Sequence, residues 1–235
     1  MNIKNSVVLI TGANRGLGLA LAKQAIAAGA SKVYGAARDP KSVTLAGVIP
    51  VQLDVTDPAS VAALARDLGD VTVVINNAGI SRGSPVTAED SVEQLRAEFE
   101  TNAVGPLLVS KAFAPTLKKN GGGAIINILS ALSWVSLPTT GTYSTSKAAA
   151  WAITNGLRGE LAAQNTQVLG AHMGYMDTDM TAGIEAAKAK PEDVADAIYA
   201  ALAAGEDEVL ADETARQVRM GLRAERGVYL GAPRT

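Results

Sequence analysis

The chain has 235 residues, of which 48% are hydrophobic and 19% charged, so it can bury the core of one globular domain and is not a disordered polyelectrolyte. Its formal net charge of −2 gives no basic surface for nucleic acid, and zero cysteines with one histidine exclude disulfides, thiolate catalysis and the common zinc and iron–sulfur sites. The first apolar run is too short for a signal peptide and none approaches the roughly 18 residues of a membrane-spanning helix, so we expect a cytoplasmic protein without membrane, nucleic-acid or metal partners.

Seven apolar runs of strand length alternate with Ala-rich segments of helical spacing. The expected strands cover residues 7–10, 32–36, 48–53, 71–75, 124–129, 167–171 and 208–210. The expected helices cover residues 17–28, 60–68, 92–99, 103–118, 144–163 and 191–203. Several strand runs are apolar at consecutive positions, which is typical of strands buried on both faces of a parallel sheet. The alternation predicts an α/β fold, a doubly wound parallel sheet of about seven strands with helices on both faces.

No repeat, low-complexity tract or interdomain linker interrupts this pattern, and the glycines at 121–123 form only a flexible connection into an expected strand. We therefore predict a single domain over residues 1–235. Its last part, residues 212–235, is expected to be a charged helix with an apolar tail around residues 228–230.

A glycine-rich segment, Thr-Gly-Ala-Asn-Arg-Gly-Leu-Gly at residues 11–18, follows the first expected strand and runs into a helix. Glycines at such a turn permit its tight geometry, the approach of backbone to a pyrophosphate and close helix–strand packing, while the helix N-terminus attracts the phosphates. The spacing is G-x-x-x-G-x-G. We predict that this loop binds a dinucleotide through Gly12, Asn14, Arg15, Gly16, Leu17 and Gly18.

The end of the second expected strand indicates which dinucleotide binds. Twenty residues past Gly18, an NAD site usually carries a carboxylate for the ribose 2′-hydroxyl, whereas an NADP site carries an arginine. Here the position is occupied by Arg38, and Arg15 in the loop offers a second positive charge. NADP(H) is therefore the predicted cofactor, with NAD(H) as the alternative.

With these features in place, the sequence resembles the short-chain dehydrogenase/reductase family over roughly residues 6–205. The matching pieces are the glycine loop, Asp54, Asn-Asn-Ala-Gly at 76–79, Asn102, Ser130, Tyr-Ser-Thr-Ser-Lys at 143–147, and residues 174–178. Ala37 followed by Arg38 resembles the NADP-preferring branch. The resemblance implies a Rossmann-like fold in which residues 1–130 mainly bind the cofactor and residues 130–235 carry the catalytic and substrate-binding groups.

The chemistry of the last motif can also be argued from its residues. Tyr143 and Lys147 are four positions apart and share one face of a helix. A free phenol titrates near pH ~10, and a neighbouring ammonium, together with the positive charge of an oxidised nicotinamide ring, favours the phenolate. We therefore predict that Lys147 lowers the pKa of Tyr143 toward neutral pH, where a phenol can exchange protons efficiently.

The family resemblance implies a role for each matching residue. Tyr143 would donate a proton to a carbonyl oxygen, Ser130 would hydrogen-bond that oxygen, Lys147 would hold the nicotinamide ribose, and Asn102, near the start of a helix at 101, would position a water for a proton relay. The implied cofactor contacts besides the loop and Arg38 are Asp54, Val55, Asn77, Ala78, Gly79, Tyr143, Lys147, Gly174 and Thr178. The implied activity is NADPH-dependent reduction of a ketone or aldehyde to an alcohol.

The substrate end departs from the family pattern. Met173 stands where Pro usually precedes Gly174, and the loop after Thr178 is short, which favours an open pocket. Its predicted walls are apolar or aromatic and favour a hydrophobic carbonyl substrate: Leu132, Trp134, Leu137, Trp151, Tyr175 and Met176. The resemblance further implies assembly into a homodimer or homotetramer through the helices at 103–118 and 144–163.

The sequence also bears on three other functions. Residues 79–83 match the hydrolase motif G-x-S-x-G, but Pro85 interrupts the helix that this motif requires, and the single histidine, His172, ends a strand. Reduction of an imine or pterin C=N bond by the same site stays open. A non-catalytic NADP-binding module would require a broken Ser–Tyr–Lys set, whereas this chain keeps all three residues.

Overall fold

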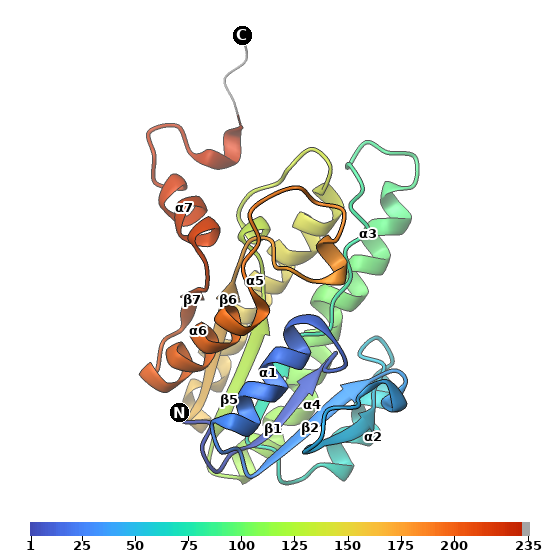
Figure 1. Ribbon diagram of the computed structural model, residues 1–235, viewed down its shortest axis with the longest axis vertical. Coiled ribbons are helices and arrows are strands. Elements are labelled where there is room, and N and C mark those ends of the chain that lie inside the picture. The colour runs from blue at the N-terminus through green and yellow to red at the C-terminus, as the bar shows by residue number, and fades with distance from the viewer. Residues whose placement is uncertain (232–235) are drawn as a thin grey trace.

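The structure, a computed structural model, describes residues 1–231 and forms one seven-stranded parallel sheet flanked by helices (Figure 1). The strands are β1 (Val7–Thr11), β2 (Lys32–Ala37), β3 (Val48–Gln52), β4 (Val73–Asn76), β5 (Gly123–Ile128), β6 (Thr166–His172) and β7 (Glu208–Leu210). Their order is β3-β2-β1-β4-β5-β6-β7 and every pairing is parallel. The predicted Rossmann-like sheet is confirmed.

Helices cover both faces of the sheet, as the doubly wound topology requires. The helices are α1 (Gly16–Ala27), α2 (Pro58–Asp67), α3 (Ser91–Phe99), α4 (Gly105–Lys119), α5 (Gly141–Leu161), α6 (Pro191–Ala204) and α7 (Glu213–Gly221). On one face, α1 and α6 share an apolar core with alternate side chains of the central strands. On the other face, α2, α4 and α5 pack on the remaining side chains of the same strands. Both faces are apolar, which explains the consecutive hydrophobic positions in the sequence.

Two segments differ from the expectations. The helix expected to begin near residue 101 instead continues from α3 into α4 through a π-helical segment, Glu100–Val104. The charged helix expected over residues 212–235 ends at Gly221, and a 3₁₀ turn follows at Val228–Leu230. Residues 232–235 of that prediction lie outside the described part of the chain.

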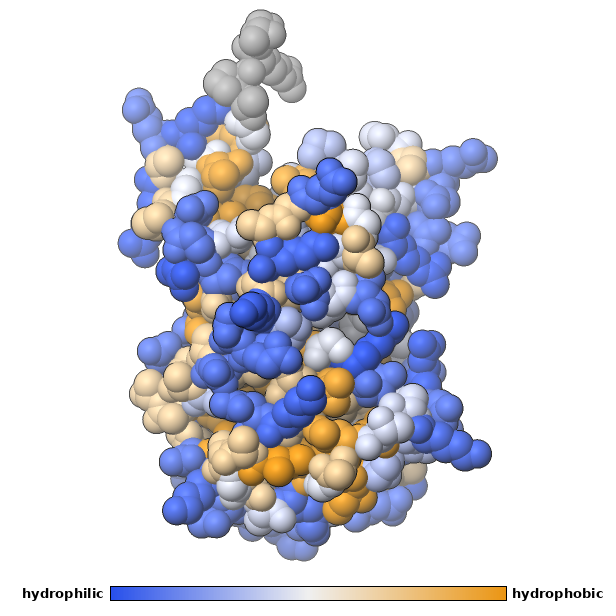
Figure 2. All heavy atoms as spheres, viewed as in Figure 1, coloured by the Kyte–Doolittle hydropathy of each residue, from blue (hydrophilic) through white to orange (hydrophobic). Residues whose placement is uncertain are grey.

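The strand order reverses between β1 and β4, and in such sheets a crevice opens beyond the carboxyl ends of the strands at this point. At the same end of the molecule, α7 projects beyond the sheet (Figure 1). Figure 2 shows a notch beside this projection. The projection, made of α7 and the turn that follows it, has exposed hydrophobic side chains at Met220, Val228, Tyr229 and Leu230. Within residues 1–231, no helix combines the length and the hydropathy needed to cross a membrane.

Candidate active site

A cleft of about 1460 Å³ lies beyond the carboxyl ends of the strands. It brings together most of the residues predicted for the cofactor, the reaction and the substrate, from segments far apart in the sequence. Those lining it are Gly12, Asn14, Arg15, Gly16, Leu17, Gly18, Arg38, Asp54, Val55, Asn77, Ala78, Gly79, Ser130, Leu132, Leu137, Tyr143, Lys147, Gly174, Tyr175, Met176 and Thr178. Three predicted residues do not line it, and these are Asn102, Trp134 and Trp151.

The glycine loop forms a cradle that side chains would fill. Gly12 and Gly16 have φ angles of +67° and +53°, a region that favours glycine. A Cβ on Gly18 would lie 2.1 Å from the carbonyl oxygen of Gly12. The Asn77 amide holds the loop from the other side by donating to the carbonyl oxygens of Thr11, at 2.9 Å, and Gly12, at 3.1 Å.

The cradle opens onto the N-terminus of α1, whose first N–H groups receive no side-chain cap. Unpaired N–H groups and the positive end of the helix dipole form a binding site for a phosphate group. The residues present therefore fit the pyrophosphate of a dinucleotide at this end of the cleft.

Charged side chains border the cradle on two sides. Arg15 forms a 3.2 Å ion pair with Asp179, in which both side chains are more than two-thirds exposed. Arg38 is exposed and lines the cleft near Asp54. Hydrogen bonds from Thr56, and to a lesser degree the charge of Arg38, lower the pKa of the Asp54 carboxyl. Asp54 therefore both forms a local turn and presents an anion to the cleft.

The three residues predicted for catalysis meet at the centre of the cleft. Ser130 follows β5, while Tyr143 and Lys147 lie one turn apart on α5. The Lys147 ammonium lies 5.8 Å from the centre of the Tyr143 ring and donates a 2.8 Å hydrogen bond to the carbonyl oxygen of Ile128. All three side chains are accessible from one side, where a substrate can contact them together.

The Ser130 hydroxyl is oriented by the backbone that follows it. Its oxygen accepts a 3.1 Å hydrogen bond from the N–H of Leu132, while the Ser130 N–H donates to the Ser133 hydroxyl. A hydroxyl carries one proton and two lone pairs, so the Ser130 proton stays available for another acceptor. That acceptor can be the Tyr143 phenol oxygen, whose pKa the Ser130 hydroxyl lowers.

The pKa shifts at these residues differ from the sequence-based prediction. Desolvation of the half-buried phenol and then the negative charge of Glu98 raise the pKa of Tyr143, and the Ser130 hydroxyl only partly opposes them. Burial also lowers the pKa of Lys147 to about 8. The predicted lowering of the Tyr143 pKa by Lys147 is therefore not found in the protein alone, because desolvation dominates. The contribution of an oxidised nicotinamide ring stays a prediction.

Asn102 lies behind the cleft, where it holds the chain beside Gly79. Its amide oxygen accepts from the N–H of Ile80 at 2.9 Å, and its amide nitrogen donates to the Ile80 carbonyl at 2.8 Å and to the Ser146 hydroxyl at 3.0 Å. The side chain is buried, with its polar atoms already occupied. Sequence reasoning placed it at a helix start, whereas it lies in the π-helical segment, a distortion often found at functional sites.

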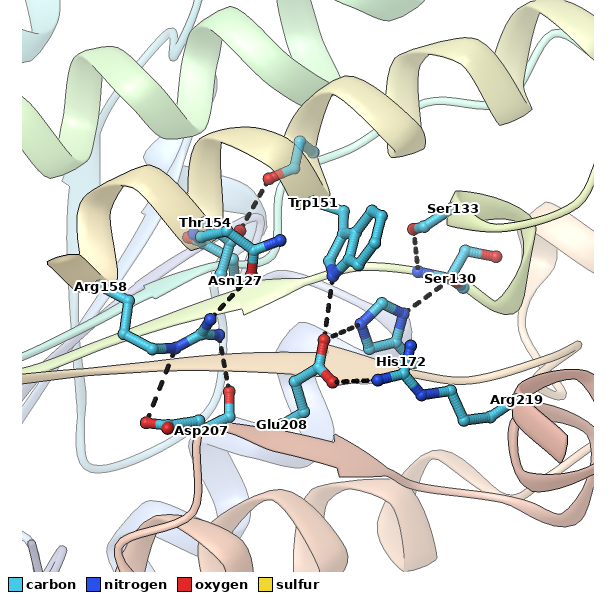
Figure 3. Close-up of polar contacts among 12 residues, drawn as sticks. Asn127, Ser130, Ser133, Trp151, Thr154, Arg158, His172, Asp207, Glu208 and Arg219 are labelled. Atoms are coloured by element: carbon cyan, nitrogen blue, oxygen red, sulfur yellow. Dashed lines mark hydrogen bonds and ion pairs between the residues drawn. The ribbon is translucent and has the colours of Figure 1, made fainter. Parts of the chain in front are cut away.

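Trp134 and Trp151 were predicted as pocket walls, and the structure corrects both. They pack around the buried His172, and Trp151 also donates to Glu208 of β7 (Figure 3). Both were predicted from their apolar character alone, which cannot distinguish a pocket wall from a packed side chain.

Sequence reasoning also missed Glu98, a fully buried carboxylate on α3. One carboxylate oxygen accepts from the N–H of Arg82 at 2.6 Å, and the other has no hydrogen-bond partner among the described residues. An acidic residue in a helix normally faces solvent, so the sequence gave no sign that Glu98 is buried. Across residues 1–231 no group of three or more potential metal ligands is found.

The comparisons with known proteins agree with this geometry. A family model described as short chain dehydrogenase matches residues 6–189, so the chain belongs to that family and is an oxidoreductase by membership.

Individual relatives extend over most of the chain. An uncharacterized oxidoreductase of Staphylococcus epidermidis is 33% identical over 212 residues, which cover 85% of this chain and 92% of the relative. The 1-deoxy-11-beta-hydroxypentalenate dehydrogenase of Streptomyces exfoliatus is 34% identical over 224 residues, covering 86% of this chain and 81% of the relative. A crystal structure of a short chain dehydrogenase from Burkholderia cenocepacia in complex with NADP is 40% identical, with a TM-score of 0.94 and coverage of 99% and 100%.

Proposed function

We propose that this protein is an NADPH-dependent carbonyl reductase, which converts a ketone or aldehyde to an alcohol and can run in reverse. The observation that carries the proposal is the meeting of Ser130, Tyr143 and Lys147 in one cleft with the glycine cradle. Proton donors beside a dinucleotide site suit the reduction of a polarised double bond.

The cofactor choice rests on positive charge at the cradle. When bound, a nicotinamide cofactor supplies the hydride that reduces the carbonyl carbon. Arg38 and Arg15 border the cradle and are suited to hold a ribose 2′-phosphate through charge-assisted hydrogen bonds. The similar Burkholderia cenocepacia protein, which was crystallised with NADP, supports this preference.

Each reacting residue has a role that follows from its surroundings. The raised pKa keeps the Tyr143 phenol protonated at neutral pH, so it can donate its proton to the substrate oxygen. The Ser130 hydroxyl, oriented by the Leu132 N–H, donates to the same oxygen and stabilises negative charge that develops there. Lys147 keeps one N–H on the Ile128 carbonyl and can direct the others toward the ribose hydroxyls of the cofactor.

Hydrophobic side chains around the substrate end define the proposed substrate class. Leu132, Leu137, Tyr175 and Met176 line this end, and Val218 of α7 adds a further apolar side chain. Apolar walls around a few polar groups favour a hydrophobic aldehyde or ketone over a polyhydroxylated or charged substrate.

A cofactor-oxidation screen tests the proposal. The purified protein would be mixed with NADPH or NADH and with aliphatic aldehydes, aryl ketones, α-ketoesters, steroids, sugars and cyclic imines. We expect turnover of hydrophobic carbonyls with NADPH and much lower catalytic efficiency with NADH. Activity on sugars or imines alone would overturn the substrate class, and equal efficiency with both cofactors would overturn the NADPH preference.

Assembly and location extend the same proposal. Assembly into a homodimer or homotetramer through α4 and α5, and a cytoplasmic location, stay predictions. Light scattering of the purified protein distinguishes a monomer from either oligomer.

A further inference from the structure

The single histidine of the chain lies directly behind Ser130. His172 ends β6 and is fully buried, and its Nδ1 lies 3.0 Å from the backbone carbonyl oxygen of Ser130 (Figure 3). A carbonyl oxygen only accepts hydrogen bonds, so the proton of this bond belongs to Nδ1. The ring therefore fixes the backbone of a residue whose hydroxyl faces the cleft.

A closed set of side chains surrounds the His172 ring. The ring stacks on Trp134, with centroids 3.8 Å apart and planes 19° apart. Its Nε2 lies 3.6 Å from the carboxylate of Glu208 on β7, which also accepts a 2.9 Å hydrogen bond from Trp151. We call these residues, together with Arg219, the His172 cluster.

Arg219 connects the cluster to the projecting helix α7. Its guanidinium donates to the second carboxylate oxygen of Glu208 at 3.2 Å and lies 5.0 Å from the Trp134 ring centre. The adjacent Val218 and the earlier Thr214, both on α7, line the cleft. One continuous set of contacts therefore runs from the substrate wall formed by α7 to the backbone of Ser130.

Stability alone does not account for this arrangement. Buried ionic and polar groups are often replaced by apolar side chains without loss of stability. Here His172 Nε2 and the Trp134 indole nitrogen are buried without hydrogen-bond partners among the described residues. The cluster nevertheless contacts the backbone of Ser130, whose hydroxyl faces the cleft, which points to a role in the site itself.

Building on the proposed function, we propose that His172 is a positioning residue that couples α7 to Ser130. The Nδ1–H holds the Ser130 carbonyl, and with it the turn that orients the Ser130 hydroxyl. Glu208 and Arg219 set the position of the ring from β7 and α7.

Two substitutions at the same position separate positioning from packing. In His172→Asn, the amide nitrogen can take the place of Nδ1 and keep the hydrogen bond to Ser130. In His172→Gln, the longer side chain reaches toward Glu208 and loses that bond. We expect kcat to fall about 10- to 100-fold in His172→Gln, because small misplacements of a donor have effects of this size. His172→Asn should retain most of kcat, and the dissociation constant for NADPH should be unchanged in both.

Arg158→Met is the matched control for damage to this edge of the sheet. Arg158 donates to the backbone oxygens of Val168 and Asp207, at the opposite end of β6 and β7 from Ser130 (Figure 3). Its loss should lower the melting temperature and leave kcat unchanged. If Arg158→Met and His172→Gln reduce kcat equally, or if His172→Asn is as impaired as His172→Gln, the positioning role is refuted.

Amide hydrogen exchange gives a readout that does not depend on turnover. The N–H of Leu132 is bonded to the Ser130 hydroxyl, so its exchange reports on that turn. We expect faster exchange at Leu132 in His172→Gln and wild-type exchange in Arg158→Met. If the wild type reduces no carbonyl while this exchange pattern holds, the proposed function fails and the positioning role stands. Wild-type exchange at Leu132 in His172→Gln overturns the positioning role, whatever the activity.

Discussion

Lys147 donates a 2.8 Å hydrogen bond to the carbonyl oxygen of Ile128 from a buried position at the cleft wall, and burial lowers its pKa to about 8. An ordinary lysine titrates at 10.5. Since each unit of pKa corresponds to about 1.4 kcal/mol, keeping this ammonium charged at neutral pH costs on the order of 3 kcal/mol of folding stability. The candidate active site thus holds a destabilising group that the proposed reaction requires.

Replacing Lys147 with Met should therefore stabilise the protein while abolishing turnover. We expect a gain of about 1–3 kcal/mol in the free energy of unfolding at pH 7, after a loss of about 1 kcal/mol for the hydrogen bond to Ile128. Urea unfolding followed by circular dichroism measures the difference.

The sign of the pH dependence checks the cause. Below pH 8 Lys147 is charged in the folded wild type, which therefore carries the full cost of the buried charge. Between pH 8 and 10.5 the folded state binds fewer protons than the unfolded state. The stability of the wild type therefore rises with pH in this range, relative to that of the variant. The advantage of Lys147→Met should shrink toward zero across this range. A variant less stable than wild type by the same amount at every pH would contradict the assignment.

The buried carboxylate of Glu98 is expected to affect the pKa of the Tyr143 phenol. Its charge raises the pKa of Tyr143, so Glu98→Gln should lower that pKa. In the direction of alcohol oxidation, where the phenolate accepts a proton, the rate rises with pH as the phenol ionises, and this rising limb of the profile should move to lower pH. Gln keeps the oxygen that accepts from the N–H of Arg82. The control is Glu93→Gln, which removes an exposed charge on the same helix and should leave the profile unchanged. A shift of the profile to higher pH in Glu98→Gln would refute the prediction.

The cofactor preference depends on Arg38. We expect Arg38→Asp to weaken NADPH binding by about 10- to 100-fold, because a charge-assisted hydrogen bond contributes roughly 1.5–3 kcal/mol, and to affect NADH much less. Isothermal titration with both cofactors measures the change. Asp179→Asn should act in the opposite direction, since it frees Arg15 from its ion pair. Equal weakening for NADPH and NADH in Arg38→Asp would remove Arg38 from the phosphate site.

Two glycines provide a test of the cradle. Gly18→Ala places a Cβ 2.1 Å from the Gly12 carbonyl oxygen, which should abolish dinucleotide binding and destabilise the loop. Gly156→Ala, on the exposed side of α5, meets nothing within 4 Å and should stabilise the protein by about 0.5–1 kcal/mol. Thermal unfolding with and without NADPH distinguishes the two. Normal cofactor binding by Gly18→Ala would rule out a tight cradle.

The parts of the fold that could be predicted from sequence are those fixed by local spacing. Consecutive apolar runs gave the strands, and the glycines at 12, 16 and 18 gave the strand-to-helix turn. The four-residue separation of Tyr143 and Lys147 likewise places both on one helix face.

The parts that could not be predicted depend on long-range packing. Trp134 packs on His172 and not into the cleft because of the turn after Ser130 and the position of β7. The residues next to Trp134 in the sequence reveal neither of these features. The pKa of Tyr143 was mispredicted because a sequence shows the nearby ammonium but not the degree of burial.

The most direct test of the central claim is a comparison of wild type and Tyr143→Phe under single-turnover conditions with NADPH and a hydrophobic aldehyde at neutral pH. Loss of the phenol proton should reduce the rate of NADPH consumption by about 10²- to 10⁴-fold, as expected for a general acid, with the NADPH dissociation constant unchanged. Consumption of NADPH at the wild-type rate by Tyr143→Phe would contradict proton donation by this residue.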